Sequence, residues 1–284
     1  MKISTEIISA YRIVGEEKAV ETIAKAGFDA WDFSISCMCD YDYDRNTMSG
    51  RFLGNDYLKI ARRLRQIGED CGIYCNQSHA PNPSDWACVR STLKRALECT
   101  AEAGGKYCII HPCCQGTLEE NVEMYQELLP FAKECGVKMA TENMFGWDYE
   151  ANIATFAPCA TPASFNEHLD GVDDPFLVAC LDIGHAEMRG SGTTAAEMVK
   201  ALGSRLHSLH IHDNDKHDDF HQIPFSMNID FVPIVKALKE IGYSGEFTLE
   251  ASAYLRAYDQ NTVLEGATRL AQSARRLADM FEQA

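Results

Sequence analysis

Short apolar runs alternate with longer segments of helical spacing along nearly the whole chain, and this alternation constrains the fold more than any other feature. Eight runs have the length and composition of buried strands: 2–9, 28–36, 72–79, 106–112, 137–143, 176–185, 206–212 and 246–252. The segments between and after them place apolar residues three and four positions apart, and most end in glycine, the usual stop signal of a helix. Strands that alternate with helices predict βα units and a parallel sheet.

The predicted helices are eight in number and cover 16–27, 55–72, 86–105, 118–136, 161–172, 194–203, 231–242 and 261–282. Eight βα units favour closure of the sheet into a (β/α)8 TIM barrel, for which 284 residues is an ordinary length. The alternative is a doubly wound open sheet, but none of the early strands is followed by the glycine-rich dinucleotide fingerprint that such a fold often carries. No linker rich in Pro, Gly or Ser divides the chain, so we expect one domain over 1–284.

The composition restricts the partners and the compartment. A formal charge of −16 disfavours binding to a polyanion such as nucleic acid, and no basic patch offsets it. The twelve cysteines are scattered without CxxC pairs, which predicts reduced thiols and a cytoplasmic location rather than disulfides or a structural zinc site. The N-terminal segment has no apolar secretory core, and no run reaches membrane-spanning length.

Polar residues stand at the ends of six successive predicted strands. In a barrel the C-terminal ends of the strands form the active site, so these side chains would meet although they are spread along the sequence. Taken singly, each is compatible with a structural role. Together they would bury several carboxylates that repel one another unless a cation binds, and mixed imidazole and carboxylate ligands suit Zn²⁺ or Mn²⁺. The residues are His79, His111, Glu142, Asp182, His185, His210, His212 and Glu250.

The motifs around these residues resemble those of a known superfamily. "QSHAP", "IIHP", "TEN", "LDIGHA", "LHIHD", "DFHQIP" and "TLEAS" follow one another in the order of the strand-end motifs of the xylose isomerase-like barrels. The resemblance extends from about Ser4 to about Ser252. This superfamily contains sugar and sugar-phosphate isomerases and epimerases, inositol-catabolism enzymes and endonuclease IV, so the motifs do not single out one substrate.

The resemblance implies a set of metal ligands. In the epimerases one divalent ion is held by a Glu, an Asp, a His and a second Glu, which correspond here to Glu142, Asp182, His210 and Glu250. In endonuclease IV further ligands complete a cluster of three zinc ions, so that between one and three ions are expected. The corresponding residues, which would hold a second metal or contact the substrate, are His79, His111, His185, Asp219 and His221.

The leading hypothesis from this resemblance is a divalent-metal-dependent isomerase or epimerase of a sugar, a sugar phosphate or a related polyol. Proton transfer would pass through an enediolate that the metal stabilises, with Glu142 and Glu250 as acid and base on opposite faces of the reacting carbon. His185 and His212 would contact substrate oxygens. His212 alternates with His210 along a strand, so its side chain can also point away from the site.

Other functions remain open at this point. An endonuclease IV-like zinc phosphodiesterase acting on abasic DNA is opposed by the acidic charge and by the absence of glycines after Asp219 and His221. A metal-dependent lyase or dehydratase and a non-catalytic binding role are further alternatives. We expect a small sugar-like molecule as the partner and neither nucleic acid nor a membrane. The sequence leaves self-association into a homo-oligomer open.

Several residues have weaker indications. Four aromatic side chains are candidates for the wall of a sugar pocket, although packing explains them equally well. Arg256 follows Glu250 by six positions and would meet a phosphate or a carboxylate, unless it is only solvated. Asp215 and His217 are interpreted as polar loop residues. The four aromatic candidates are Trp31, Trp86, Phe145 and Trp147.

Overall fold

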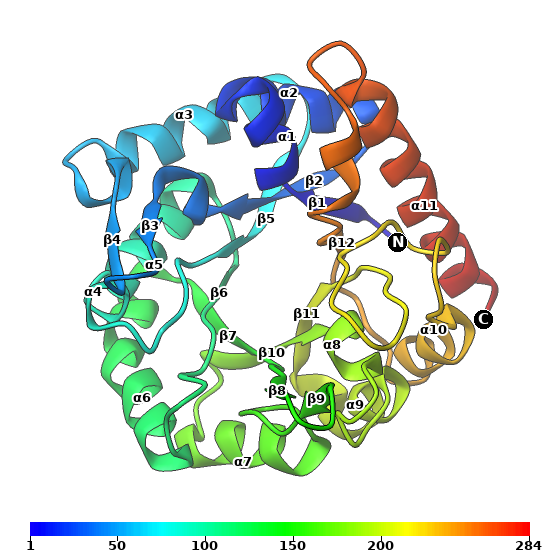
Figure 1. The fold of residues 1–284 in the computed structure, drawn as a ribbon. Helices are drawn as coiled ribbons and strands as arrows, with labels where there is room; N and C mark the ends of the chain where they lie inside the picture. The colour runs from blue at the N-terminus through cyan, green and yellow to red at the C-terminus, as the bar shows by residue number, and fades with distance from the viewer.

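The computed structural model describes residues 1–284, and its centre is a barrel of eight parallel strands (Figure 1). The barrel order is β11, β10, β7, β6, β5, β2, β1 and β12. Past the strand ends, Ile211 N–H donates to Thr248 O at 2.9 Å and Glu250 N–H donates to Ile211 O at 3.0 Å, which joins β11 to β12. The predicted TIM barrel is therefore confirmed. The strands are β1 Ile3–Glu6, β2 Ala30–Ser34, β5 Tyr74–His79, β6 Tyr107–Ile109, β7 Lys138–Glu142, β10 Leu177–Asp182, β11 Leu206–His210 and β12 Phe247–Leu249.

Eight helices surround the barrel, and each follows one of its strands (Figure 1). Local signals fix several of their ends. The helix α6 begins with a capping box between Thr117 and Glu120 and ends at Gly136, which has the left-handed φ of +67° that glycine adopts without strain. The eight helices are α2 Glu16–Ala26, α3 Tyr57–Asp70, α5 Leu93–Ala103, α6 Leu118–Cys135, α7 Pro162–Val172, α9 Ala195–Leu202, α10 Phe231–Glu240 and α11 Val263–Gln283.

The structure adds short elements that the sequence pattern does not predict. Two hairpins, β3 Asp40–Asp42 with β4 Thr47–Ser49 and β8 Gly146–Asp148 with β9 Ile153–Thr155, extend from the loops after β2 and β7. Three-residue strands are too short to show an alternating pattern. The remaining short helices are α1 Ile8–Val14, α4 Ala87–Arg90 and α8 Ile183–Glu187, with 3₁₀ turns η1 Ile35–Met38, η2 Arg51–Leu53, η3 Gly203–Arg205 and η4 Tyr254–Ala257.

The strands are also shorter than the apolar runs that predicted them. The run 106–112 contains only β6, and the run 246–252 contains only β12, so His111 and Glu250 lie just beyond their strands. The apolar character continues past the ladder because the first loop residues are still buried, as Ile110 and Ala251 are. Burial, rather than strand pairing, therefore determines the length of the apolar runs.

The barrel interior below its C-terminal end is polar and hydrogen-bonded. Ser4 Oγ donates to Asn76 Oδ1 at 2.7 Å, and Asn76 Nδ2 donates to Thr248 Oγ1 at 3.0 Å. Ser208 Oγ donates to Gln77 Oε1 at 2.6 Å. Because each of these buried polar groups finds a partner, this layer forms a stable floor beneath the mouth of the barrel.

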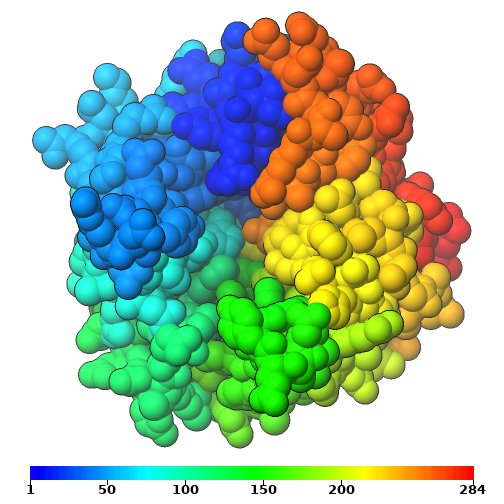
Figure 2. Space-filling model, in the orientation of Figure 1, coloured from blue at the N-terminus to red at the C-terminus, as the bar shows by residue number.

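The face at the C-terminal ends of the strands is hollowed at its centre, between the segments coloured blue, green, yellow and orange (Figure 2). The hairpins and the loops after β11 and β12 rise around this hollow (Figure 1). Among the helices, none combines the length and the apolar character needed to cross a membrane. The hollow is the place where the predicted strand-end residues should meet.

Substitution of Phe247 tests how much the closing strand β12 contributes to the stability of the barrel. Its ring is 1% exposed and packs edge-on against Phe281 of α11, with centroids 5.6 Å apart. We expect Phe247→Ala to lower the free energy of unfolding by about 3–5 kcal/mol, because it removes a buried ring and leaves a cavity. Leu264→Ala, on the exposed side of the same helix with 42% exposure, should change it by about 0.5 kcal/mol or less. Urea unfolding measures both; equal effects would contradict this description of the core.

Candidate metal centre

A cavity of about 340 Å³ occupies the mouth of the barrel and is lined by residues from nearly every βα unit. Most of the lining is polar or charged, with only Ile8, Met144 and Phe145 as apolar members. Its volume lies at the lower end of the range for small-molecule pockets. The site therefore has the size and polarity expected for a small hydrophilic ligand.

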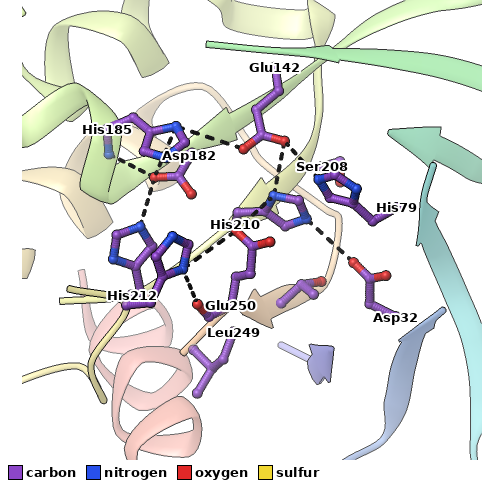
Figure 3. Close-up of polar contacts among 12 residues, drawn as sticks. Asp32, His79, Glu142, Asp182, His185, Ser208, His210, His212, Leu249 and Glu250 are labelled. Atoms are coloured by element: carbon purple, nitrogen blue, oxygen red, sulfur yellow. Dashed lines mark hydrogen bonds and ion pairs between the residues drawn. The ribbon is translucent and has the colours of Figure 1, made fainter. Parts of the chain in front are cut away.

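Four ligand-type side chains meet at the floor of this cavity, and we call them the first cluster: Glu142, Asp182, His210 and Glu250. One oxygen or nitrogen of each lies within 4.8 Å of the others. His210 Nδ1 is 3.1 Å from Glu142 Oε2 and 3.4 Å from Glu250 Oε2 (Figure 3). Three carboxylates and one imidazole from four different βα units thus surround a common point.

The hydrogen bonds of His210 indicate what this point requires. Its Nε2 lies 3.4 Å from Asp32 Oδ2, and Asp32 also accepts a bond of 2.8 Å from Gln77 Nε2. In the tautomer whose Nε2–H donates to Asp32, Nδ1 of His210 carries a lone pair that faces Glu142 and Glu250. Neither this Nδ1 nor Glu142 Oε2 has a hydrogen-bond partner. Facing lone pairs repel unless a proton or a metal cation lies between them. The donor set therefore fits a divalent ion.

A second cluster lies beside the first and consists of His185, His212, Asp219 and His221. His212 Nε2 is 3.2 Å from Asp182 Oδ1 and 3.3 Å from Asp219 Oδ1. His185 Nδ1 lies 2.9 Å from Asn143 O and His221 Nδ1 lies 2.7 Å from Glu250 O, and these bonds orient each Nε2 toward Asp219. Backbone carbonyls often orient metal-binding histidines in this way.

His79 and His111 are two further possible ligands, and they lie next to Glu142 of the first cluster. Their Nε2 atoms are 2.9 Å apart, and His111 Nε2 is 3.2 Å from Glu142 Oε2. His79 Nδ1 lies 2.8 Å from Ala80 O, so its Nε2 faces the cavity. His79, Glu142 and His210 also satisfy the geometry of a candidate metal group. The structure thus contains three groups able to hold an ion, two of which share Glu142 and His210.

Local sequence explains how several ligands are held. Asp182 ends β10 and caps the short helix α8, since its Oδ1 accepts from His185 N–H at 2.8 Å. Asn143 joins β7 to β10 by exchanging two hydrogen bonds with the backbone of Asp182. Gly184 is required because a Cβ there would lie 1.9 Å from His212 Cε1. Within the five residues of "LDIGH", Asp182 is therefore both a helix cap and a candidate ligand, and Gly184 leaves the space that His212 occupies.

The loop after β11 is held by Asp213, whose carboxylate accepts from Met227 N–H at 2.9 Å and Ile229 N–H at 3.0 Å. Within this loop His221 has a φ of +45°, a conformation that is costly for a residue with a Cβ. His221 keeps it while bonding to Glu250 O and Asp219. The strained residue lies in the candidate site, where such strain is most often found.

The buried charges shift one another's protonation. Burial opposes ionisation of Glu142, but the charges of His210 and His111 outweigh it and hold its pKa well below the usual range. Burial raises the pKa of Glu250 to about 8, against the opposing charges of His210 and His221. Burial, with His111 and His210 nearby, lowers the pKa of His79 to about 3. Two neighbouring glutamates thus have very different proton affinities because their surroundings differ.

The structure brings together every ligand position that the strand-end motifs predict. The four ligand positions implied by the epimerases, the five implied by endonuclease IV, and His212 all line the cavity at the barrel mouth or lie directly beneath it. The side-chain direction of His212, which the sequence leaves open, is defined by the structure. His212 points inward and is fully buried, with its Nε2 between Asp182 and Asp219 at 3.2 and 3.3 Å, and it does not line the cavity directly. Its contact with a substrate oxygen stays a prediction.

The weaker candidates divide. Phe145 and Arg256 line the cavity, whereas the three tryptophans do not, and of the two explanations given for them packing fits their contacts. Trp31 alternates with the inward-facing Asp32 and is fully buried against the helix layer. Trp86 packs against Tyr41 and Tyr43, and Trp147 packs edge-on against His217 outside the cavity. The interpretation of His217 as a loop residue fits its bond to Asn152 O.

The first two strands also contribute to the site, which the sequence motifs do not reveal. Glu6 of β1 and Asp32 of β2 are buried, line the cavity and are paired in register across the sheet. Burial raises the pKa of Glu6, although its hydrogen bonds to Ser9 oppose this. The sequence signal for these two residues is a carboxylate inside an apolar run: Glu6 at the end of "KISTE" and Asp32 within "AWDFS". They follow the same strand-end rule that selects the ligands from the third strand onward.

Comparison with known proteins agrees with the fold and the motifs. A family model described as the xylose isomerase-like TIM barrel matches residues 20–282, and the chain therefore belongs to this family. An uncharacterised protein of Methanocaldococcus jannaschii is 26% identical over 254 residues, which are 82% of this chain and 78% of that protein.

Solved structures of low sequence identity share the fold. A D-tagatose 3-epimerase-like protein superposes with a TM-score of 0.71 at 22% identity, covering 98% of this chain and 99% of the other. The IolI protein, in a structure with a bound zinc atom, superposes with a TM-score of 0.68 at 19% identity, covering 100% and 99%. The superfamily expected from the strand-end motifs is thus confirmed.

A pair of histidine variants tests the first cluster. We expect His210→Asn to lower the affinity for Zn²⁺ or Mn²⁺ by about 100-fold or more, since losing even the groups that orient a ligand costs about 10- to 100-fold. His217→Asn, in an exposed part of the following loop, should bind metal as the unaltered chain does. Elemental analysis after equilibration at limiting metal measures both, with circular dichroism as a check of folding. Full metal content in His210→Asn would contradict the assignment of this cluster.

Proposed function

We propose that this chain, acting as one domain over residues 1–284, is a divalent-metal-dependent isomerase or epimerase of a sugar or a related polyol. The observation that carries the proposal is the first cluster, in which two buried carboxylates, one partly buried carboxylate and one imidazole converge on the floor of a small polar cavity. The name of the D-tagatose 3-epimerase-like relative supports sugar chemistry on this fold, and the zinc in the IolI structure supports a metal.

A divalent ion held by the first cluster would supply electrophilic stabilisation to negative charge that develops on a substrate oxygen. The chain's own carboxylates would move the proton. Glu142 from β7 and Glu250 after β12 approach His210 Nδ1 from different sides of the mouth, at 3.1 and 3.4 Å. A carbon bound between them would expose one face to each carboxylate, so that one removes a proton and the other returns one.

The surrounding residues would hold these two carboxylates in place and position the substrate. Asp32 and Gln77 fix the ring of His210 from below. His185 lines the cavity and bonds to Asn143 O through Nδ1, which leaves Nε2 for a substrate oxygen or a second ion. We assign His212, together with Asp219 and His221, to the second cluster.

The second cluster favours one alternative function. With His79 and His111 it would complete a site for several zinc ions, as an endonuclease IV-like phosphodiesterase on abasic DNA requires. The charge of −16 opposes this function, because binding to duplex DNA depends on cations that release its counterions. A metal-dependent lyase or dehydratase would use the same first cluster to remove the proton, but a group would then leave from the neighbouring carbon instead of a proton being returned.

Proton exchange with solvent tests the proposed function. The metal-loaded protein should incorporate deuterium from D₂O at one carbon of an open-chain ketose or its derivatives, detected by NMR. We expect Glu142→Gln and Glu250→Gln each to slow exchange at least about 100-fold per bound metal ion, because general acid–base catalysis contributes about 10²–10⁴-fold. Glu240→Gln, an exposed residue paired with Lys200, is the matched control and should leave the rate unchanged.

Two results would contradict this function. Exchange at the same rate in Glu142→Gln and Glu250→Gln, normalised to metal content, would remove both residues from proton transfer. Cleavage of abasic duplex DNA at moderate salt, with no exchange on any sugar, would favour the phosphodiesterase.

A further inference from the structure

Two arginines at the mouth of the barrel differ from most others in this chain. Acidic residues outnumber basic ones by 42 to 26, and nine arginines form ion pairs with a carboxylate. Arg12 and Arg256 form no ion pair and no side-chain hydrogen bond in the structure. Three further arginines, Arg95, Arg189 and Arg276, also lack an ion pair. Arg12 and Arg256 are distinguished because their exposed, unpaired side chains line one and the same cavity.

Arg12 and Arg256 lie on neighbouring elements and line the same cavity. Arg12 belongs to α1, which follows β1, and Arg256 belongs to η4, which follows β12. These two elements pack against each other at the rim, where α1 lies beside the orange segment in Figure 1. Two guanidinium groups separated by 244 positions in the sequence are therefore brought to one wall of one pocket.

The charge in the cavity is separated between its floor and this wall. The other ionisable residues of the lining are carboxylates and histidines, and no lysine is among them. Ser34, Ser36, Asn82 and Ser252 provide neutral polar groups in the same lining. A ligand in this cavity therefore meets metal-binding groups at the floor, hydroxyl and amide groups beside it, and two exposed positive charges at the rim.

We propose that Arg12 and Arg256 bind an anionic group, a phosphate or a carboxylate, at the end of the sugar that lies away from the metal ligands. The planar guanidinium presents paired N–H donors that match the oxygens of either group, and a charged hydrogen bond of this kind is about twice as strong as a neutral one. This inference rests on the proposed function and narrows its substrate to acidic sugar derivatives. The cavity, with about 340 Å³, suits one monosaccharide with such a group rather than a polymer.

The test compares three forms of one ketohexose with the metal-loaded protein in D₂O: the neutral sugar, its terminal phosphate ester and the corresponding ketohexuronate. We expect kcat/KM for one anionic form to exceed that for the neutral form at least tenfold, and the form preferred identifies the phosphate or the carboxylate as the bound group. Arg12→Gln and Arg256→Gln should each lower this ratio at least tenfold through a higher KM, and Arg256→Lys should restore part of it. Arg205→Gln, which loses only a surface pair with Asp170, should not change the ratio.

A binding measurement keeps this inference separate from the proposed function. Calorimetric titration of inorganic phosphate and of malonate into the metal-loaded protein should show binding that Arg256→Gln weakens at least tenfold and Arg205→Gln does not. Exchange on the neutral sugar at a rate equal to both anions, with no effect of the arginine variants, would overturn the anion site and leave the isomerase standing. If no sugar exchanges at all, the proposed function fails, and the titration alone decides whether the arginines bind anions.

Discussion

Three carboxylates, two of them buried and one partly buried, around the lone pair of one imidazole repel one another strongly unless positive charge lies among them. Glu142, Asp182 and Glu250 meet His210 in this arrangement. Burial in a medium of low polarity makes such repulsion far more costly than in water. Protons can offset part of it: the charges of His210 and His111 hold the pKa of Glu142 low, whereas burial raises the pKa of Glu250. A divalent cation offsets it more completely and uses the free electron pairs that point inward.

The rest of the structure can be understood as the frame that maintains this repulsive arrangement. The parallel barrel aligns the ends of strands that are distant in sequence, and its polar floor supports the cluster from below through Asp32 and Gln77. The cap at Asp182 and the absent side chain at Gly184 place the second cluster against the first. A strained backbone at His221 and a buried Asp213 hold the loop that completes it. Rigid elements thus carry all the groups that would otherwise move apart.

Much of the fold and of the candidate site could be predicted from the sequence, because both depend on regular positions. Helical spacing and eight apolar runs define the barrel, and the ends of parallel strands must converge. The strand pattern alone therefore assigns His79, Glu142 and His210 to one end of the barrel. The resemblance in motifs added Asp219 and His221, which lie on a loop without a periodic signal.

Other features could not be predicted because they depend on three-dimensional packing. Trp31 and Asp32 are neighbours on β2, and Trp31 faces the helices. The alternation of side chains along a strand does not by itself decide which of the two lines the cavity. The inward direction of His212 depends on the space left by Gly184. Arg12 lies on a short helix whose contact with η4 joins the first and last βα units, and sequence spacing carries no information on such a contact.

The position of a bound ion tests the central claim most directly. Crystals of the protein grown with Mn²⁺ and measured at the manganese absorption edge would locate it by anomalous scattering. We predict a peak among Glu142, Asp182, His210 and Glu250, within about 2.0–2.3 Å of His210 Nδ1 and an oxygen of each carboxylate. The absence of an anomalous peak from the barrel mouth, or a peak only between His185, Asp219 and His221, would contradict this claim.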